Sequence, residues 1–241
     1  MQIVRPKPGI GTRIFNALLF VVCCLTLVAA LLYIFFYVTA AKVENLPVLK
    51  DGDIVFNISP SRQSLPIALA SRSLLTHMGI VRLDKNGKAV VTEASATVRE
   101  TPLQDWIDHG VAGRLVIKRP KEITPEQLEG VFAFTAKQAG KPYDIFFTEA
   151  DDRFYCSELV QDAYRAGAGM TLGTPQKIGD LSIDSGPVLA LMQERWQAYP
   201  LCRNGQAKNF TACLEIVKKQ SLITPASIAK DAQLENIYSN F

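Results

Sequence analysis

Phe154-Tyr155-Cys156-Ser157-Glu158-Leu159-Val160 is the stretch of this 241-residue chain that decides its fold. Apolar or partly apolar residues recur here with the one-sided spacing of an amphipathic helix, at Leu159, Val160, Ala163 and Tyr164. Gly167 is a natural stop for that helix. The pattern therefore predicts a helix that begins at or just after Cys156.

A cysteine in the first turn of a helix meets unpaired backbone N–H groups and the positive end of the helix dipole. Both stabilise a thiolate, the nucleophilic form of the side chain. Cys156 is thus a candidate nucleophile. The alternative is structural, because free cysteines are often small buried residues.

A second feature is the apolar stretch from Ala17 to Ala41, which has 25 residues and no charge. A helix of about 20 such residues crosses a bilayer, and a core helix is seldom this long. We expect a membrane anchor in which Cys23 and Cys24 are simply apolar members. A cleaved signal peptide ending at Val38-Thr39-Ala40 is the alternative, although its apolar region would be only about 7–15 residues.

Charges around this stretch predict its orientation. Arg5, Lys7 and Arg13 precede it, whereas Lys42 and Glu44 follow it. Basic residues stay preferentially in the cytoplasm. The N-terminus is therefore expected in the cytoplasm and the rest of the chain outside.

The remaining cysteines suggest an oxidising compartment. Cys202 and Cys213 lie close together in a polar segment of the exported part, so we expect a disulfide worth about 3 kcal/mol. Cys156 is then the one cysteine of the exported part that is left without a disulfide partner, as reactive cysteines often are.

Charge and acidic residues exclude other classes of partner. The net charge is +3, and no run of Lys and Arg is dense enough for a nucleic-acid surface. Asp151 and Asp152 are adjacent, but no histidine or further carboxylate has metal-ligand spacing, so we expect a solvated loop, no metal and no cofactor.

A hairpin is predicted for the two stretches His77–Leu83 and Lys88–Ala94. A two-residue Asn86-Gly87 turn would pair Ile80 with Glu93 and leave His77 on the opposite face from that carboxylate. A three-residue loop with Gly87 in the left-handed conformation pairs Gly79 with Glu93 instead. We favour this second register, in which the His77 and Glu93 side chains are diagonal neighbours within reach of each other.

Other elements follow from apolar spacing and caps. We expect strands near Ile54–Ile58 and Leu115–Ile117, and helices at Leu65–Leu75, Leu103–Asp108, Thr124–Gly140 and Val188–Trp196. The helix after Thr124 is the best marked, because Pro125 and Gln127 complete its N-terminal signals.

A cysteine nucleophile needs a base and a group that orients the base. The chain has two histidines, and His109 lies in a Gly-flanked loop with no evident partner. His77, by contrast, lies beside Gly79 and across from Glu93. Cys156, His77 and Glu93 therefore form a candidate Cys-His-Glu triad.

These motifs resemble a known family. Asp51-Gly52-Asp53-Ile54-Val55-Phe56, Thr76-His77-Met78-Gly79-Ile80, Tyr143-Asp144 and the Cys156 stretch are similar to the permuted papain-like amidases, the YiiX/YebB-like branch of the NlpC-type superfamily. The likeness covers roughly Val48 to Gly167. It implies an α+β fold in which the cysteine helix packs on a small antiparallel sheet or partial barrel, with the histidine strand before the cysteine helix.

The resemblance also implies roles for residues. It makes Cys156 the nucleophile, His77 the base and Glu93 the third residue of a thiol hydrolase. The backbone N–H of Cys156 is a candidate oxyanion donor, and Tyr143 or Tyr155 is a candidate second donor in substrate binding.

We accordingly expect a single-pass protein of the bacterial inner membrane with its C-terminal domain in the periplasm. Its predicted parts are a cytoplasmic segment at 1–16, a transmembrane anchor at 17–41, a linker at 42–50, a permuted papain-like catalytic domain at 51–200 and a C-terminal extension with the disulfide at 201–241. Three functions are compatible with the sequence. They are an amidase or peptidase acting on cell-wall peptides, a lipid acyl hydrolase or acyltransferase with the same triad, and a non-catalytic binding protein.

Overall fold

The structure is a computed structural model and describes residues 9–150, 152–203 and 205–241. Arg5, Lys7 and Asp151, used above to predict orientation and a solvated loop, lie outside the described residues, as does the side chain of Arg13. The chain divides into two compact units, and the boundary along the sequence falls between Ala40 and Ala41. Each unit is described by itself.

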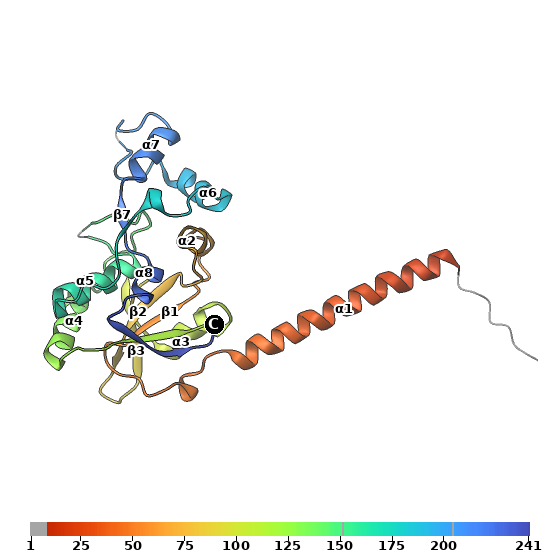
Figure 1. The fold of residues 1–241 in the computed structure, drawn as a ribbon, viewed down its shortest axis with the longest axis horizontal. Helices are drawn as coiled ribbons and strands as arrows, with labels where there is room; N and C mark the ends of the chain where they lie inside the picture. The colour runs from red at the N-terminus through yellow and green to blue at the C-terminus, as the bar shows by residue number, and fades with distance from the viewer. Residues whose placement is uncertain (1–8, 151, 204) are drawn as a thin grey trace, which may run out of the picture. The chain divides into compact units, whose positions relative to one another are not determined.

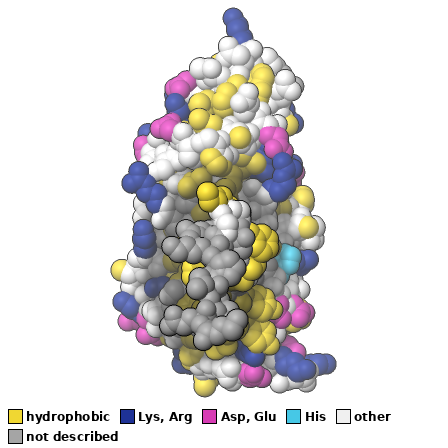
Figure 2. Space-filling model, turned by 90° about the vertical axis from the view of Figure 1, so that its right-hand side faces the viewer, with side chains coloured by type: hydrophobic (Ala, Val, Ile, Leu, Met, Phe, Trp, Pro, Cys, Tyr) yellow, Lys and Arg dark blue, Asp and Glu magenta, His cyan; other side chains and the backbone are white. Residues whose placement is uncertain are grey.

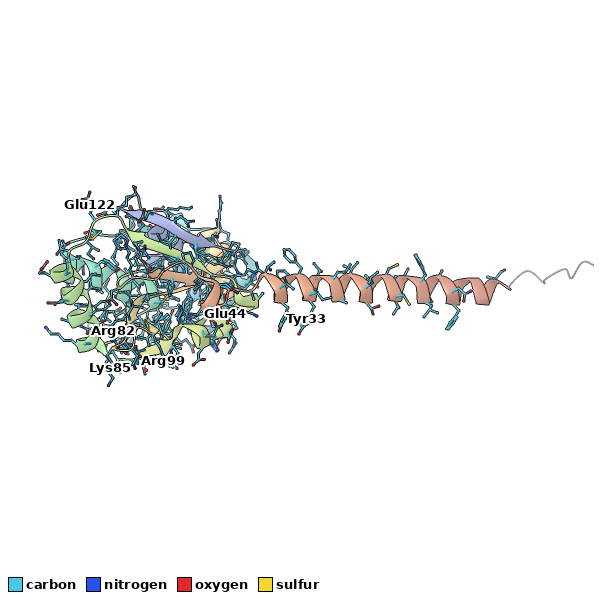
Figure 3. All side chains as sticks on the ribbon, turned by 90° about the horizontal axis from the view of Figure 1, so that it is seen from below. Tyr33, Glu44, Arg82, Lys85, Arg99 and Glu122 are labelled. Carbon is cyan, nitrogen blue, oxygen red and sulfur yellow. A yellow bond between two sulfur atoms is a disulfide. The ribbon has the colours of Figure 1, made fainter. Side chains whose placement is uncertain are left out.

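The first unit is one long helix, α1 (Ile10–Thr39). Its segment Ile14–Thr39 has 26 residues and a mean hydropathy of 2.9, which makes it long and apolar enough to cross a membrane. Side chains project on all sides of it, Tyr33 among them (Figure 3). No residue of the most apolar part of this segment is buried inside the protein.

The second unit is built on a six-stranded antiparallel sheet with strand order β4-β3-β2-β1-β5-β8 (Figure 1). Its strands are β1 (Ile54–Asn57), β2 (His77–Leu83), β3 (Ala89–Ala94), β4 (Val98–Pro102), β5 (Val116–Pro120) and β8 (Leu234–Ser239). The helices of its first half are α2 (Ser64–Ser71), α3 (Leu103–His109), α4 (Pro125–Gln138) and α5 (Cys156–Ala168). Short 3-10 turns occupy Val43–Asn45, Val111–Gly113 and Ile178–Asp180.

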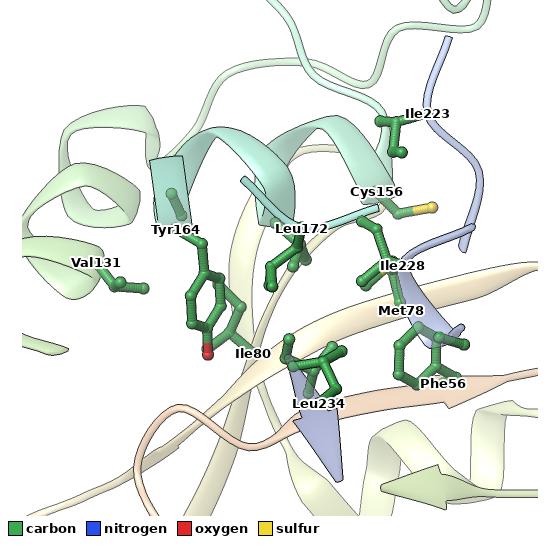
Figure 4. Packing of buried hydrophobic residues seen from close by; sticks show 14 of the residues in the cluster. Phe56, Met78, Ile80, Val131, Cys156, Tyr164, Leu172, Ile223, Ile228 and Leu234 are labelled. Carbon is green, nitrogen blue, oxygen red and sulfur yellow. The ribbon is translucent and has the colours of Figure 1, made fainter. Parts of the chain in front are cut away.

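The two faces of the sheet bury different sets of side chains. Ile54, Phe56, Met78 and Ile80 pack against α5 and its surroundings (Figure 4). Alternate residues on the same strands, such as Val55 and Val81, pack against α3 and the segment after Ala41. The predicted α+β fold with the cysteine helix on an antiparallel sheet is therefore confirmed.

Helices α4 and α5 cross in close contact. Thr124 and Gln127 form the predicted capping box at the start of α4. A Cβ atom on Gly167 would lie 2.3 Å from the carbonyl carbon of Gly130, so neither glycine leaves room for a side chain. Gly167 is thus a packing residue and not the predicted stop; α5 continues to Ala168, and Gly169 ends it with a φ of 67°.

The C-terminal part of the chain belongs to the same compact unit. It contains β6 (Gln176–Lys177), α6 (Gly186–Arg195), α7 (Phe210–Val217), β7 (Ser221–Leu222) and α8 (Pro225–Ala229) before β8. Strand β8 pairs with β5, and Ile223, Ile228 and Leu234 lie in the core beneath α5. The last strand completes the sheet, so residues on both sides of Pro200 lie in the same compact unit.

Helices α6 and α7 build a further hydrophobic cluster of this unit, and we call this part of the chain the cap. Its buried side chains include Val188, Tyr199, Cys202, Cys213 and Val217. Cys202 and Cys213 are joined as a disulfide with their Cα atoms 5.3 Å apart. Hydrophobic side chains also reach the surface at this end of the domain (Figure 2).

Candidate active site

The register of the β2–β3 hairpin brings His77 and Glu93 together. Ile80 pairs with Thr92 and Val81 with Val91, so Gly79 is opposite Glu93 as predicted. The loop closes with Gly87 at a φ of 73°, the conformation expected for the three-residue turn. A Cβ atom at Gly79 would lie 2.7 Å from the carbonyl oxygen of Thr92, so only glycine fits here.

Glu93 is buried, and neighbouring side chains contact both of its carboxylate oxygens. Its Oε2 atom lies 2.6 Å from Nε2 of His77 and accepts a hydrogen bond of 3.0 Å from the indole Nε1 of Trp106. Its Oε1 atom accepts hydrogen bonds from Thr101 at 2.7 Å and from Arg99 at 3.1 Å. Burial raises the pKa of Glu93, but His77, Thr101 and Arg99 outweigh burial and lower this pKa to about 2. Glu93 is therefore an anion at physiological pH.

His77 is the first residue of β2 and lies between Glu93 and Cys156. Its ring stacks on Trp106 of α3, with centroids 5.8 Å apart. Because Nε2 faces Glu93, Nδ1 is the ring nitrogen left to interact with Cys156, which acts on the imidazole electrostatically. Burial lowers the pKa of His77, but the interactions with Cys156 and Glu93 outweigh burial and raise this pKa to about 9. The imidazolium is therefore favoured at neutral pH.

Cys156 is the first residue of α5, and its sulfur projects from the end of that helix (Figure 4). The other end of the helix is held by Tyr164, which is fully buried and donates to the carbonyl of Gly52. Ser157, next to the thiol, donates to the carbonyl of Ile223. The helix that carries the thiol is thus fixed both to the turn that precedes β1 and to the C-terminal segment.

The two tyrosines proposed as oxyanion donors have different positions. Tyr143 lies near enough to Cys156 for the two groups to interact electrostatically. Burial first, and then the neighbouring Cys156, raise the pKa of Tyr143, so it keeps its proton. The hydroxyl of Tyr155 instead accepts a hydrogen bond from the backbone N–H of Ile223 at 3.2 Å. The hydroxyl of Tyr155 is therefore engaged with the C-terminal segment, whereas Tyr143 interacts with Cys156.

Two hollows adjoin the site. A cavity of about 130 Å³ is lined by Cys156 and by apolar side chains of the cap. A groove of about 610 Å³ is lined by both polar and apolar side chains, among them His77, Glu93, Ala94 and Ile145. Tyr143 lines both hollows.

Some residues of this site have no strong signal in the sequence. Arg99 and Thr101 lie on β4, for which we predicted no strand, and Trp106 was expected only as part of a helix. His109 lines the polar groove but makes no contact with the thiol among the interactions of the described residues. The described part of the chain has no group of three or more His, Cys, Asp or Glu side chains that could hold a metal ion.

Comparisons with known proteins agree with this geometry. The sequence model of the family described as "Permuted papain-like amidase enzyme, YaeF/YiiX, C92 family" matches residues 48–238. The protein YiiX of Escherichia coli strain K12 is 40% identical over 146 residues, which are 60% of this chain and 72% of that protein. The crystal structure of the metalloprotein YiiX from Escherichia coli O157:H7 superposes with a TM-score of 0.70 and 31% identity, covering 80% of this chain and 98% of that one.

The match continues well beyond Gly167, where the sequence motifs end, because it includes the cap and β8. That relative is named a metalloprotein, whereas the described residues of this chain contain no group of three or more His, Cys, Asp or Glu side chains that could hold a metal ion. The chain belongs to the family of permuted papain-like amidases and is a cysteine peptidase- or amidase-like hydrolase.

Proposed function

We propose that Cys156, His77 and Glu93 form the catalytic triad of a membrane-anchored thiol hydrolase. The observation that carries the proposal is the 2.6 Å contact between Glu93 and His77, together with the electrostatic interaction of His77 with Cys156 at the start of α5. In such a triad the imidazolium stabilises the thiolate, and the carboxylate orients the imidazole.

The reaction has two steps. The Cys156 thiolate attacks the carbonyl carbon of an amide or ester, and the bond to the leaving group breaks as His77 gives the leaving group its proton. Water then attacks the thioester, His77 takes the water's proton, and the acid is released as the carbon–sulfur bond breaks.

The oxyanion of each tetrahedral intermediate needs hydrogen-bond donors. The backbone N–H of Cys156 and the hydroxyl of Tyr143 are the candidates. Support comes from Tyr143, which interacts electrostatically with Cys156 and retains its proton because burial raises its pKa. One such donor is commonly worth about 3 kcal/mol of transition-state stabilisation.

The proposed location is the outer face of a bacterial inner membrane. The apolar segment Ile14–Thr39 would anchor the chain, and the disulfide Cys202–Cys213 is typical of an oxidising compartment. An amide of a cell-wall peptide is the substrate that family and location together suggest.

Labelling of the thiol tests the triad without knowledge of the substrate. We expect iodoacetamide to modify Cys156 of the full chain at pH 6, where an unactivated thiol is almost wholly protonated. The His77→Ala variant should react at least about 10-fold more slowly, and Cys156→Ala should lose hydrolysis of both peptidoglycan fragments and acyl esters. Equal labelling rates in wild type and His77→Ala would refute the triad.

A further inference from the structure

Several strands of the second unit have their ends at one end of the sheet, the end that carries His77. There β1 finishes with Asn57, which pairs with His77 at the start of β2. Strand β5 begins at the same end, because Val116 pairs with Phe56, and β8 finishes there, because Ser239 pairs with Val116. We call it the His77 end of the sheet.

Exposed apolar side chains gather at the His77 end. Helix α2 is held there, because the hydroxyl of Ser64 at its start is hydrogen-bonded to Thr76, the residue before His77. Val111 is held there by its backbone N–H, which donates to the carbonyl of Ile58 at 2.9 Å. The large hydrophobic side chains exposed at this end are Leu65, Leu69, Leu74, Val111, Ile145 and Phe241, whereas Val48 lies elsewhere.

The opposite end of the sheet carries charged loops instead. Lys85 and Lys88 are exposed in the β2–β3 loop, and Lys121 and Glu122 are exposed in the turn after β5. Figure 3 shows Lys85 on the opposite side of this unit from Glu44. Exposed apolar residues of a soluble domain are usually scattered singly, so their collection at one end indicates a contact surface.

The chain enters the second unit at the His77 end. Helix α1 ends at Thr39, and Ala41 is already buried, with its backbone N–H donating to the carbonyl of Gly113 at 3.0 Å. The side chain of Asn240 donates to the same carbonyl, so Ala41 adjoins both the Val111–Gly113 turn and the C-terminal segment. Two Cα steps, about 7 Å of chain, therefore separate the end of α1 from this surface.

The length of the apolar segment sets the level at which the span ends. The 26 residues of Ile14–Thr39 extend about 39 Å as a helix, close to the ~40–45 Å of a bilayer with its headgroups. A span of this length ends among the headgroups. The surface around Ala41 then begins within about 7 Å of them, whatever angle the helix takes.

Charged side chains near this surface occur with both signs. Arg62, before α2, pairs with Glu194 at 3.1 Å. Lys42 is followed two residues later by Glu44. Attraction to anionic headgroups is therefore a small contribution, and a contact with lipid depends on the apolar side chains.

We propose that the His77 end of the second unit rests on the lipid bilayer that holds α1, with Leu65, Leu69 and Val111 inserted among the headgroups. This inference rests on the membrane anchoring proposed above and does not depend on the triad. Helix α2 then has two different sides, because Leu65 and Leu69 are exposed whereas Ile67 lines the groove of His77. The groove is thereby held at the membrane surface.

Quenching of tryptophan fluorescence tests the proposal on the full chain in lipid nanodiscs. Lipids brominated high on the acyl chain quench a tryptophan that lies beside them. The tryptophan of Val111→Trp should lose most of the fluorescence that it adds to the native signal. The tryptophan of Asn86→Trp, in the exposed β2–β3 loop, should lose none. Tyr33→Trp in α1 reports whether the span itself lies in the bilayer.

Two pairs of charge substitutions supply the matched comparison. Leu65→Asp with Leu69→Asp changes exposed side chains only, so the unfolding midpoint should stay close to that of the wild type. This pair should remove most of the quenching of Val111→Trp. Lys85→Asp with Lys88→Asp, at the charged end, should leave that quenching unchanged. A rise from about 0.1 M to about 1 M salt should also change it little, because the contact is apolar.

The outcomes separate this proposal from the anchoring on which it rests. Quenching of Tyr33→Trp without quenching of Val111→Trp would overturn the lipid contact and leave the anchor standing. No quenching of Tyr33→Trp would overturn the anchor itself. Equal quenching of Val111→Trp and Asn86→Trp would show that no particular end faces the lipid. An unquenched Val111→Trp in nanodiscs that hold two cross-linked chains would assign this end to a second copy and would also overturn the proposal.

Discussion

Trp106 and His77 contact the same oxygen of Glu93, the Oε2 atom, from two different elements. The indole N–H of Trp106 donates to it at 3.0 Å, while Nε2 of His77 lies 2.6 Å away. The same indole stacks on the His77 ring. Trp106 thus fixes both the carboxylate and the plane of the imidazole, and it shields their hydrogen bond from water.

Replacing Trp106 with Phe should test this positioning role. The stack on His77 remains, but Glu93 loses one donor in a buried place, a loss of about 1.5–3 kcal/mol for a charged acceptor. We expect kcat to fall about 10-fold or more with a smaller effect on KM. The readout is steady-state kinetics together with the unfolding midpoint. Ile107→Val, at a neighbouring buried position of α3, controls for general loosening and should change kcat little.

The pH dependence of turnover should report His77. Its raised pKa of about 9 means that the proton needed by the leaving group is present below that pH and is lost above it. We expect kcat/KM to fall as pH rises through about 9. In Glu93→Gln the anion next to His77 is gone, so this fall should begin at lower pH.

The matched control is Glu100→Gln, which removes an exposed carboxylate of β4 that pairs with Arg82 and not with His77. Its profile should coincide with that of the wild type. An unchanged alkaline limb in Glu93→Gln would contradict the coupling of Glu93 to His77.

Glu158 should make stability depend on pH in the opposite way from a paired carboxylate. Burial raises its pKa to about 8, although it accepts a hydrogen bond from the backbone N–H of Tyr155. The folded protein keeps a proton that the unfolded chain releases from about pH 4.5 upward, so stability falls as pH rises from there to about 8.

Glu158→Gln cannot ionise and should remove this fall. We expect a higher Tm than wild type at pH 8.5 and little difference at pH 5, measured by calorimetry. Glu129→Gln, on the exposed side of the neighbouring helix α4, should leave the Tm unchanged at both pH values. A lower Tm for Glu158→Gln at both values would show that its packing matters more than its charge.

The disulfide of the cap should contribute stability from the loop that it closes. Cys202 and Cys213 are 11 residues apart in sequence, and a loop of that length predicts about 3 kcal/mol. The Cys202→Ser, Cys213→Ser double variant should lower the denaturant midpoint accordingly. Cys23→Ser with Cys24→Ser in α1 is the control and should leave the midpoint of the domain unchanged. No loss in the double variant of the cap would refute the estimate.

Much of this site could be predicted because local signals agreed with the final packing. The β2–β3 register followed from Gly87 in a short loop, and it placed Glu93 beside His77. The start of α5 followed from apolar spacing around Leu159. Both are local patterns of a few residues, and each adopts in the folded protein the local structure that its sequence predicts.

The contacts that were missed depend on tertiary structure. Strand β4 is short and largely exposed, with Arg99 and Glu100 where a buried strand would carry apolar residues, so its sequence resembles a loop. Arg99, Thr101 and Trp106 reach Glu93 only once β4 and α3 fold against β3. Likewise, the packing role of Gly167 depends on Gly130 of another helix, which no pattern within α5 records.

The contact between Gly130 and Gly167 has a mechanical consequence for the thiol. It lies near one end of α5, whereas Cys156 lies 11 residues away at the other end, about 16 Å along the axis. A methyl group added at Gly167 would push this end of α5 away from α4. Because the helix is rigid, the resulting tilt would move the sulfur of Cys156 at the other end relative to the imidazole of His77. Substitutions at this crossing should therefore alter reactivity without touching any residue of the site.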